Sequence, residues 1–158
     1  MQITRIKQNE IKQVVELIKR SIEKSFTEFY PEQTIKYLST KLDYNAMKER
    51  ETWTHFYVAK IENKIVGCGA IGPYWGSETE SCLFNIFVDP DYQKQGIGKK
   101  IVQTLEQDEY FLRASRIEIP AAIHAIPFYK KLGYKHKNGE LIYDDGHFAL
   151  EKFNKPTK

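Results

Sequence analysis

The chain is poor in the residues that mark metal-binding and disulfide-rich proteins. Its 158 residues include two cysteines, Cys68 and Cys82, which form no C-x-x-C motif and have no histidine close to them in the sequence. Structural zinc sites take four Cys or His ligands, and two cysteines are too few for the disulfide framework of a small secreted domain. Both thiols lie in apolar, strand-like segments, so we expect reduced core residues of a cytoplasmic protein and no metal site.

Charge of one sign, long apolar runs and repeats are scarce as well. Lys and Arg number 24 against 21 Asp and Glu, a net charge of +3, and no basic run suggests a nucleic-acid-binding stripe. No apolar stretch approaches the roughly 18 residues that indicate a membrane-spanning helix, and residues 1–4 begin a strand-like segment, not a signal peptide. We therefore expect a single domain over residues 1–153, a polar tail at 154–158, and neither nucleic-acid nor membrane partners.

Hydrophobic periodicity predicts an α/β (α+β) fold of about six or seven strands and about four helices. Apolar residues recur at helical spacing in residues 10–26 and 98–112, and residues 41–52 are expected to form a loop. Strand 81–88 is apolar on both faces, which places it at the centre of the sheet. The expected order is strand 2–7, helices 10–26 and 31–39, strands 53–60, 64–71 and 81–88, helix 98–112, strand 116–119, helix 124–132, and strands 134–137 and 146–153.

A glycine-bearing loop follows the central strand and leads directly into a helix. Residues 86–100 read I-F-V-D-P-D-Y-Q-K-Q-G-I-G-K-K. Gly96 and Gly98 let a ligand approach the backbone closely, and the free N–H groups of a helix start favour an anion, above all a phosphate. The loop is not a Walker motif, which needs G-x-x-x-x-G-K-[ST], and not a dinucleotide fingerprint, which needs a third glycine where Ile101 stands.

Three lysines add to this signal. Lys94, Lys99 and Lys100 crowd the positive end of the helix dipole, where each cation costs about 0.3–1 kcal/mol. A bound polyanion would turn that cost into a gain. For each lysine the alternative, a solvated position on a basic turn, stays open.

Two motifs together resemble the GNAT N-acetyltransferase superfamily, with the ribosomal-protein alanine N-acetyltransferases as the closest-looking branch. The run Gln93-x-x-Gly96-x-Gly98, after a strand ending in V-D-P, is similar to the family's pyrophosphate loop, [QR]-x-x-G-x-[GA]. Residues 125–134 read A-I-P-F-Y-K-K-L-G-Y and resemble the signature A-x-x-F-Y-x-x-x-G-[FY]. The resemblance covers residues 3–153 and has both motifs in the right order, so the chain is identified as a member.

The resemblance implies a mixed, mostly antiparallel sheet that splays between its fourth and fifth strands and holds acetyl-coenzyme A in the gap. It implies direct attack of a primary amine on the thioester in a ternary complex. Two alternatives stay open: a coenzyme A-binding sensor or interaction domain without turnover, and a nucleotide-binding module. The residues implied to bind the cofactor are Ile86, Phe87 and Val88 on the strand edge, and Gln93, Lys94, Gln95, Gly96, Ile97, Gly98 and Lys99 in the loop.

The resemblance also suggests catalytic residues. Tyr129 matches the tyrosine that protonates the departing thiolate as general acid, although a purely packing role stays open. Glu118 resembles the base of the alanine N-acetyltransferases, and Glu80 is its rival near the start of the fourth strand. A chain of water molecules can replace either carboxylate, both of which can equally face solvent. His124 is open as base, cap or solvated residue, and Ala122 replaces a coenzyme A-contacting asparagine of the family.

The acceptor is not identified by these patterns. A small-molecule amine and a protein or peptide amine are both compatible with the family. Aromatic residues are frequent in the regions expected to surround the acceptor, and they fit an apolar pocket, ordinary packing or a homodimer surface equally well. They are Phe26, Phe29, Tyr30, Tyr44, Trp53, Tyr74 and Trp75.

Overall fold

A computed structural model of the protein describes residues 1–154. Its eight strands form one mixed sheet in the order β1-β2-β3-β4-β5-β8-β6, with β7 paired to β8. Only β4 and β5 run parallel, so the expected mixed, mostly antiparallel sheet is confirmed. The strands are β1 (Gln2–Arg5), β2 (His55–Ile61), β3 (Lys64–Pro73), β4 (Glu80–Val88), β5 (Arg116–Ala121), β6 (Lys135–His136), β7 (Tyr143–Asp144) and β8 (His147–Phe153).

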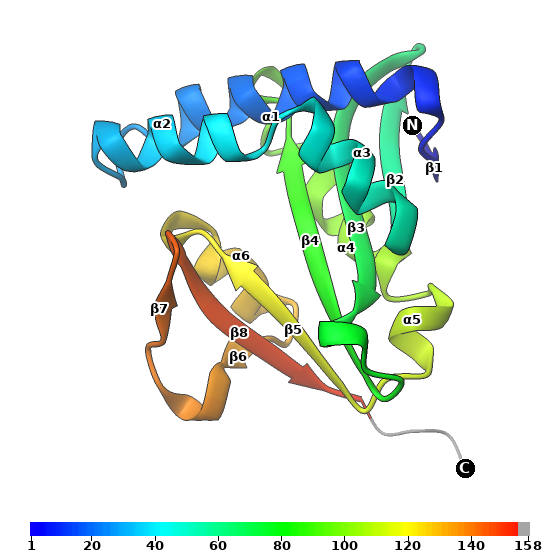
Figure 1. Cartoon of the computed structure of the whole chain (residues 1–158), viewed down its shortest axis with the longest axis vertical. Coiled ribbons are helices and arrows are strands. Elements are labelled where there is room, and N and C mark those ends of the chain that lie inside the picture. Colours follow the sequence, from blue (N-terminus) through cyan, green and yellow to red (C-terminus); the bar gives the residue numbers. More distant parts are fainter. Residues whose placement is uncertain (155–158) are drawn as a thin grey trace.

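Helices cover both faces of this sheet (Figure 1). One core lies between the sheet and α1, α2 and α3, and a second lies between the sheet and α4, α5 and α6. No helix within residues 1–154 has both the length and the apolar character that crossing a membrane requires. The helices are α1 (Ile11–Ser25), α2 (Glu32–Lys41), α3 (Tyr44–Trp53), α4 (Ile97–Leu105), α5 (Glu109–Leu112) and α6 (Ile126–Lys131).

Two expectations about the helices are wrong. Residues 41–52 are not a loop, because α3 occupies most of them. Asp43 caps the start of this helix, and its side chain accepts a 2.9 Å hydrogen bond from the Ala46 N–H. The helix expected over 98–112 is interrupted after Leu105. Asp108 ends the intervening turn by accepting a hydrogen bond from the Tyr110 N–H at 2.9 Å, which starts α5.

These two differences explain why residues 1–154 form six α-helices where about four are expected. The strand that was not expected is β7, which has only two residues and pairs with β8 through Tyr143 and Phe148. Such a short strand leaves no alternating pattern in the sequence from which it could be predicted.

The sheet opens between β4 and β5. These strands pair through only three residues each, from Glu80 opposite Arg116 to Cys82 opposite Glu118. Beyond that point β4 and β5 diverge toward the end of the molecule that α1 and α2 cover (Figure 1). The divergence leaves backbone N–H and C=O groups at the facing edges without a strand partner, and such groups need another partner.

Helix α4 lies unusually close to β3. A Cβ atom at Gly67 would come within 2.8 Å of the Ile101 side chain, and one at Gly69 within 2.7 Å of it. Real side chains do not tolerate such distances, so glycine at these two positions allows the helix to pack directly on the strand. The close packing fixes the position of the N-terminus of α4 relative to the opening between β4 and β5.

Candidate functional site

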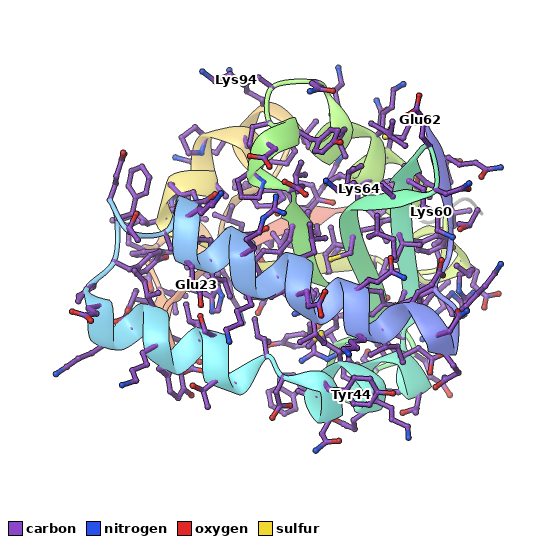
Figure 2. All side chains as sticks on the ribbon, turned by 90° about the horizontal axis from the view of Figure 1, so that it is seen from above. Glu23, Tyr44, Lys60, Glu62, Lys64 and Lys94 are labelled. Atoms are coloured by element: carbon purple, nitrogen blue, oxygen red, sulfur yellow. The ribbon has the colours of Figure 1, made fainter. Side chains whose placement is uncertain are left out.

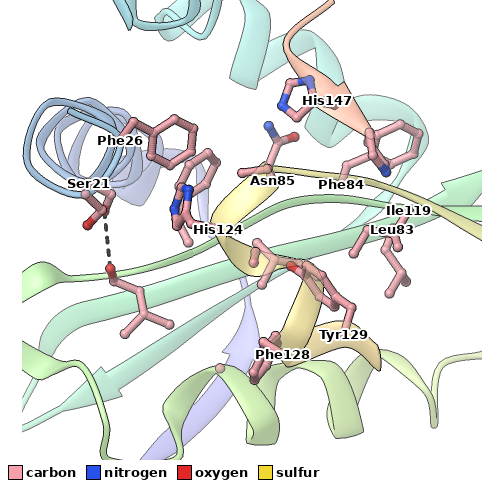
Figure 3. Close-up of a pocket in the computed structure, with 18 of the residues that line it drawn as sticks. Ser21, Phe26, Leu83, Phe84, Asn85, Ile119, His124, Phe128, Tyr129 and His147 are labelled. Atoms are coloured by element: carbon pink, nitrogen blue, oxygen red, sulfur yellow. Dashed lines mark hydrogen bonds between the residues drawn. The ribbon is translucent and has the colours of Figure 1, made fainter. Parts of the chain in front are cut away.

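A cavity of about 790 Å³ lies where β4 and β5 diverge (Figure 3). One part of its wall comes from the second half of β4 and from the loop between β4 and α4. The opposite part comes from β5, from Ala122 and His124 in the segment that leads into α6, and from Phe128 and Tyr129 of α6 itself. The C-terminal ends of α1 and α2, Arg50 of α3 and the segment from β7 to β8 complete the lining.

The loop before α4 has the geometry of an anion-binding helix start. Gly96 caps α4 with a left-handed backbone (φ 77°), and Lys94 is also left-handed (φ 62°). Glycine adopts that conformation at little cost. The Gln93 side chain donates a 2.9 Å hydrogen bond to the Val88 carbonyl, which folds the loop back onto the end of β4. The N–H groups of the first turn of α4 are therefore presented at the cavity.

A buried carboxylate attaches this loop to α1. Asp89 is almost fully buried, forms an ion pair with Arg20 and accepts a 2.9 Å hydrogen bond from the Asp91 N–H. Ser21 on α1 donates a 3.3 Å hydrogen bond to the Val88 carbonyl (Figure 3). These contacts join α1, the end of β4 and the loop into one support for the helix start.

The predicted cofactor residues gather at this cavity. Of the ten, only Gln95 is absent from its lining, and the other nine contribute to it. Among the three lysines, Lys94 and Lys99 line the cavity while Lys100 does not. Figure 2 shows Lys94 at the outer edge of the molecule. The binding role of these residues stays a prediction, but the fold brings them to one place.

Tyr129 lies on the opposite wall. It belongs to α6, is 5% exposed and lines the cavity. Its hydroxyl makes no hydrogen bond to any residue of 1–154, and burial raises the pKa of the phenol. A tyrosine with a raised pKa keeps its proton at neutral pH, so the side chain is a proton donor without a protein acceptor.

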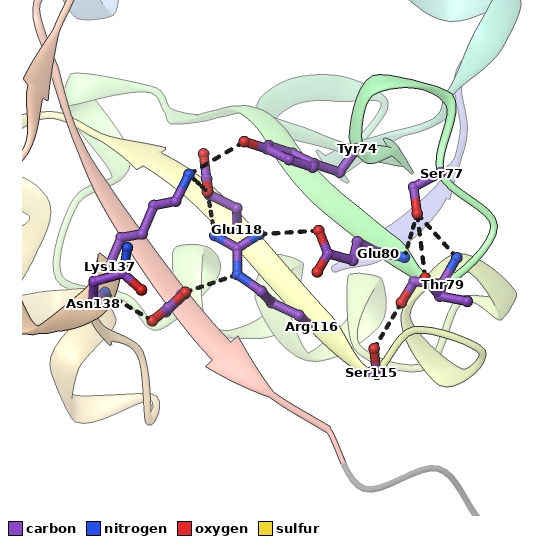
Figure 4. Close-up of polar contacts among 10 residues, drawn as sticks. Tyr74, Ser77, Thr79, Glu80, Ser115, Arg116, Glu118, Lys137 and Asn138 are labelled. Carbon is purple, nitrogen blue, oxygen red and sulfur yellow. Dashed lines mark hydrogen bonds and ion pairs between the residues drawn. The ribbon is translucent and has the colours of Figure 1, made fainter.

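The predicted bases lie in a charged cluster at the paired end of β4 and β5 (Figure 4). Arg116 donates to Glu118, to Glu80 at 3.5 Å and to Glu151 at 2.7 Å. Burial alone would lower the pKa of Arg116, but the hydrogen bonds to Glu151 and Glu118 outweigh it and raise that pKa. Neither Glu118 nor Glu80 is among the residues that line the cavity.

Glu118 and Glu80 nevertheless differ in position. Glu118 is paired with Cys82 at the last register position before β4 and β5 separate, and the next residue, Ile119, lines the cavity. Both bonds to Glu118, from Arg116 and from Lys137 at 2.9 Å, go to its Oε1 atom. Its Oε2 atom makes no hydrogen bond with the described residues and can accept one from water.

A β-bulge distorts β4 beside the cavity. Asn85 and Ile86 together lie opposite the single residue Gly69 of β3, and Asn85 has a left-handed backbone (φ 54°). The Asn85 side chain accepts a 2.8 Å hydrogen bond from Arg50 of α3, and both residues line the cavity. Neither was predicted as a site residue. The one available signal is a lone amide, Asn85, within an otherwise apolar strand.

His124 is held between aromatic rings. It stacks on Phe29 with ring centroids 4.8 Å apart and contacts Phe26 edge to face at 4.6 Å. Burial lowers the pKa of its imidazole, and its Nδ1 atom is buried without a partner among residues 1–154. The adjacent Ile123 N–H donates a 2.7 Å hydrogen bond to the Tyr30 hydroxyl.

The aromatic residues suggested for an acceptor pocket do not form one pocket. Of the seven, only Phe26 lines the cavity. Trp53 packs edge to face on Phe84, Tyr74 accepts a 3.2 Å hydrogen bond from Lys137, and Trp75 is 91% exposed. The far end of the cavity is instead polar and is formed by Lys41, Arg50, Asn85, Asp144, Asp145 and His147.

Residues 1–154 contain no group of three or more His, Cys, Asp or Glu side chains placed to hold a metal ion. Cys68 and Cys82 are both buried free thiols. Burial raises the pKa of the Cys68 thiol to about 12, so this thiol is protonated at neutral pH.

Comparison with known proteins gives consistent results. Residues 52–136 match the family model described as an acetyltransferase (GNAT) domain. An uncharacterized N-acetyltransferase of Methanocaldococcus jannaschii is 33% identical over 91 residues, 52% of this chain and 39% of that protein. The [ribosomal protein bS18]-alanine N-acetyltransferase of Escherichia coli is 40% identical over 58 residues, 35% of this chain. The chain thus spans 39% of the length of each of these two relatives.

Among solved structures, the PaiA N-acetyltransferase of Thermoplasma acidophilum in complex with coenzyme A superimposes with a TM-score of 0.81. The superposition covers 97% of this chain and 98% of that one, at 16% sequence identity. At this identity the likeness concerns the fold.

Proposed function

The chain belongs to the GNAT acetyltransferase family, and from this premise we propose that it moves an acetyl group from acetyl-coenzyme A to a primary amine. The observation that carries the proposal is the meeting of two distant segments at one cavity. The glycine loop of residues 93–99 and Tyr129 of α6 line its opposite walls, between strands that have separated.

The cavity fits the cofactor in its main chemical features. The left-handed Gly96 and the first turn of α4 offer backbone N–H groups to the pyrophosphate, and Lys94 and Lys99 add positive charge. The edge formed by Ile86, Phe87 and Val88 has no strand partner on the side of β5 and offers backbone groups to the amides of the pantetheine arm, apart from the Val88 carbonyl, which Gln93 and Ser21 already bond. Ala122, which lacks an amide side chain, contributes no such contact.

Acetyl-coenzyme A supplies the acetyl group as an activated thioester. The chain's contribution is to place the amine, to supply a proton to the departing sulfur and to take one from the amine. An amine attacks only in its neutral form, and a free ammonium has a pKa of about 10.4. We assign the proton donation to the Tyr129 hydroxyl, which opens on the cavity and has no acceptor among the described residues.

For the base we favour Glu118 over Glu80. Glu118 stands at the last pair between β4 and β5, and its Oε2 atom is available to a water molecule. Glu80 stands two pairs farther from the opening. In this proposal Glu118 works through water, because its side chain does not line the cavity itself.

The experiment that tests the function is a screen of primary amines with acetyl-coenzyme A, followed by detection of the free thiol and of the acetylated product. Small amines, amino acids and peptides with free N-termini should be included. Acetylation of any amine above the rate of the reaction without protein supports the proposal. Tight coenzyme A binding with no acetylated product across the panel would favour a sensor or interaction domain.

A further inference from the structure

Arg50 is a cation at the cavity wall with no carboxylate beside it. Its guanidinium lies 4.3 Å from the ring centroid of Phe84 and 5.4 Å from that of Trp53. It donates one hydrogen bond, from Nη1 to the Asn85 side chain at 2.8 Å. No carboxylate oxygen of residues 1–154 lies within 4.0 Å of it, whereas the arginines at positions 20 and 116 each contact carboxylates.

An unpaired guanidinium in such a position is costly. Arg50 is partly buried, and this burial lowers its pKa, against smaller opposing effects of Cys82 and Glu49; charges taken out of water in proteins are normally paired. Of the five N–H donors that a guanidinium carries, one is used by Asn85. The other basic group at this end of the cavity, Lys41, already forms an ion pair with Asp145. Arg50 therefore borders the cavity without a carboxylate partner among residues 1–154.

We propose that Arg50 binds a carboxylate of the acceptor, and that the acceptor is a small amino acid whose amine is acetylated. This inference rests on the proposed function and gives its substrate class. The planar, forked guanidinium matches a carboxylate with two parallel hydrogen bonds. Such an acceptor would place a carboxylate next to Arg50, where none of residues 1–154 provides one.

The position of Arg50 argues for an amine close to the carboxylate. Asn85, its hydrogen-bond partner, is at the bulge of β4, next to the strand edge of residues 86–88 that we assign to the cofactor. A carboxylate bound there is beside the region where the thioester must lie. An α- or β-amino acid has its amine one or two carbons from the carboxylate, whereas the N-terminal amine of a protein has a peptide carbonyl in that place.

The alternative is that Arg50 only supports the bulge through Asn85 and the rings of Phe84 and Trp53. Both explanations predict that replacing Arg50 lowers activity. They differ in whether the loss depends on the acceptor's carboxylate, so the test compares acceptors in pairs.

The experiment measures kcat/KM for glycine and β-alanine, and for phenylalanine as a larger acceptor, each against its primary amide. The measurements use the wild-type protein and Arg50→Met, which keeps an unbranched apolar stem and removes the charge. Comparing acid with amide in both proteins cancels the different basicities of the amines. We expect the acid-to-amide ratio to fall by about 10- to 100-fold in Arg50→Met, mainly through KM, with the amide rates little changed.

Two further variants show whether a change in the acid-to-amide ratio comes from the lost guanidinium or from misfolding. Arg113→Met removes an exposed arginine that lies over Tyr110, away from the cavity, and should leave the ratio unchanged. Arg50→Lys keeps the charge and loses the fork, so an intermediate ratio is expected even if Arg50→Met fails to fold. Calorimetry of the same acids with coenzyme A-saturated protein gives a readout without turnover, with weaker binding expected in both Arg50 variants.

The outcomes separate this inference from the proposed function. Acetylation of amines with no preference for the carboxylate, or an equal loss for acids and amides in the Arg50 variants, overturns the role of Arg50 and leaves the acetyltransferase intact. If no amine is acetylated and coenzyme A does not bind, the proposed function fails and the inference fails with it. A carboxylate preference that Arg50→Met abolishes supports both.

Discussion

Glu118 lies opposite Cys82 in the last pair that joins β4 to β5. Beyond this pair β4 and β5 separate, and before it they are paired. Arg116 and Lys137 hold the Glu118 carboxylate through its Oε1 atom, and its Oε2 atom has no partner among the described residues. Glu80 also contacts Arg116 but stands two pairs farther from the opening, so the two carboxylates can be compared directly.

If Glu118 takes the proton from the amine through water, Glu118→Gln should lower kcat by about 10²- to 10⁴-fold, the usual contribution of a general base. The loss should be measured under conditions where chemistry limits the rate, with coenzyme A affinity determined separately. Glu80→Gln is the matched control, because it also removes a carboxylate from Arg116. We expect its kcat to stay within about threefold of wild type; equal losses in the two variants would indicate a structural effect.

Tyr129→Phe removes the proposed proton donor and keeps the ring. We expect kcat to fall by about 10²- to 10⁴-fold with little change in coenzyme A affinity, which places the loss in the transition state. Tyr134→Phe is the control: it removes another buried hydroxyl, bonded to Glu106 at 2.9 Å, outside the cavity lining. It should lower the unfolding free energy by about 1 kcal/mol and leave kcat unchanged. Wild-type kcat in Tyr129→Phe would remove the hydroxyl from the mechanism.

Acetyl-coenzyme A should raise the melting temperature, because it binds the folded state. At a concentration of one hundred times Kd, it should raise the unfolding free energy by about 2.7 kcal/mol. Gly96→Val should abolish this increase. A Cβ at Gly96 meets no protein atom within 4 Å, so the loss would come from blocking the phosphate and from the left-handed backbone. Gly139→Val introduces the same backbone strain (φ 72°) at an equally open position outside the cavity. In thermal melts the Gly139→Val protein should have a lower melting temperature than the wild type, and acetyl-coenzyme A should still raise it.

The carboxylate of Glu151 should make stability depend on pH in the acid range. Burial would raise its pKa, but the Arg116 guanidinium and the Asn138 N–H hold that pKa below its usual value. The unfolded chain then binds more protons than the native one, so the contribution of Glu151 is complete above about pH 4.3 and is lost as the pH falls through the lowered native pKa.

Glu151→Gln should therefore lower the unfolding free energy at pH 7 by about 1.5–3 kcal/mol and make its decline in acid shallower. Urea unfolding at several pH values measures both effects. Glu140→Gln, an exposed carboxylate of the same region, is the control and should change neither. A Glu151→Gln protein with the wild-type acid decline would assign that decline to other carboxylates.

The fold class, the family and the cavity's two main walls could be predicted because their signals are local. Gly96 and Tyr129 belong to short motifs whose residues are adjacent in the sequence and form a loop and a helix by themselves. Long strands and α1 were likewise predicted from their own periodicity. Their meeting at a cavity follows from the resemblance to a known fold, and not from periodicity.

Arg50 and the polar end of the cavity could not be predicted in this way. Only one residue of α3, Met47, is buried, so the helix has no apolar stripe that distinguishes it from a loop. The contact of Arg50 with Asn85 joins residues 35 positions apart and depends on how α3 packs against β4. The interruption of the helix after Leu105 is a similar case, because a single capping carboxylate, Asp108, decides it.

The close packing of α4 on Gly67 and Gly69 links one wall of the cavity to residues that lie outside its lining. A Cβ atom at either position would first meet the side chain of Ile101, at 2.8 Å from Gly67 and 2.7 Å from Gly69. Alanine at either position would therefore press on Ile101 of α4, the helix whose first turn borders the cavity. The absence of two methyl groups inside the sheet thus helps to set where that wall stands.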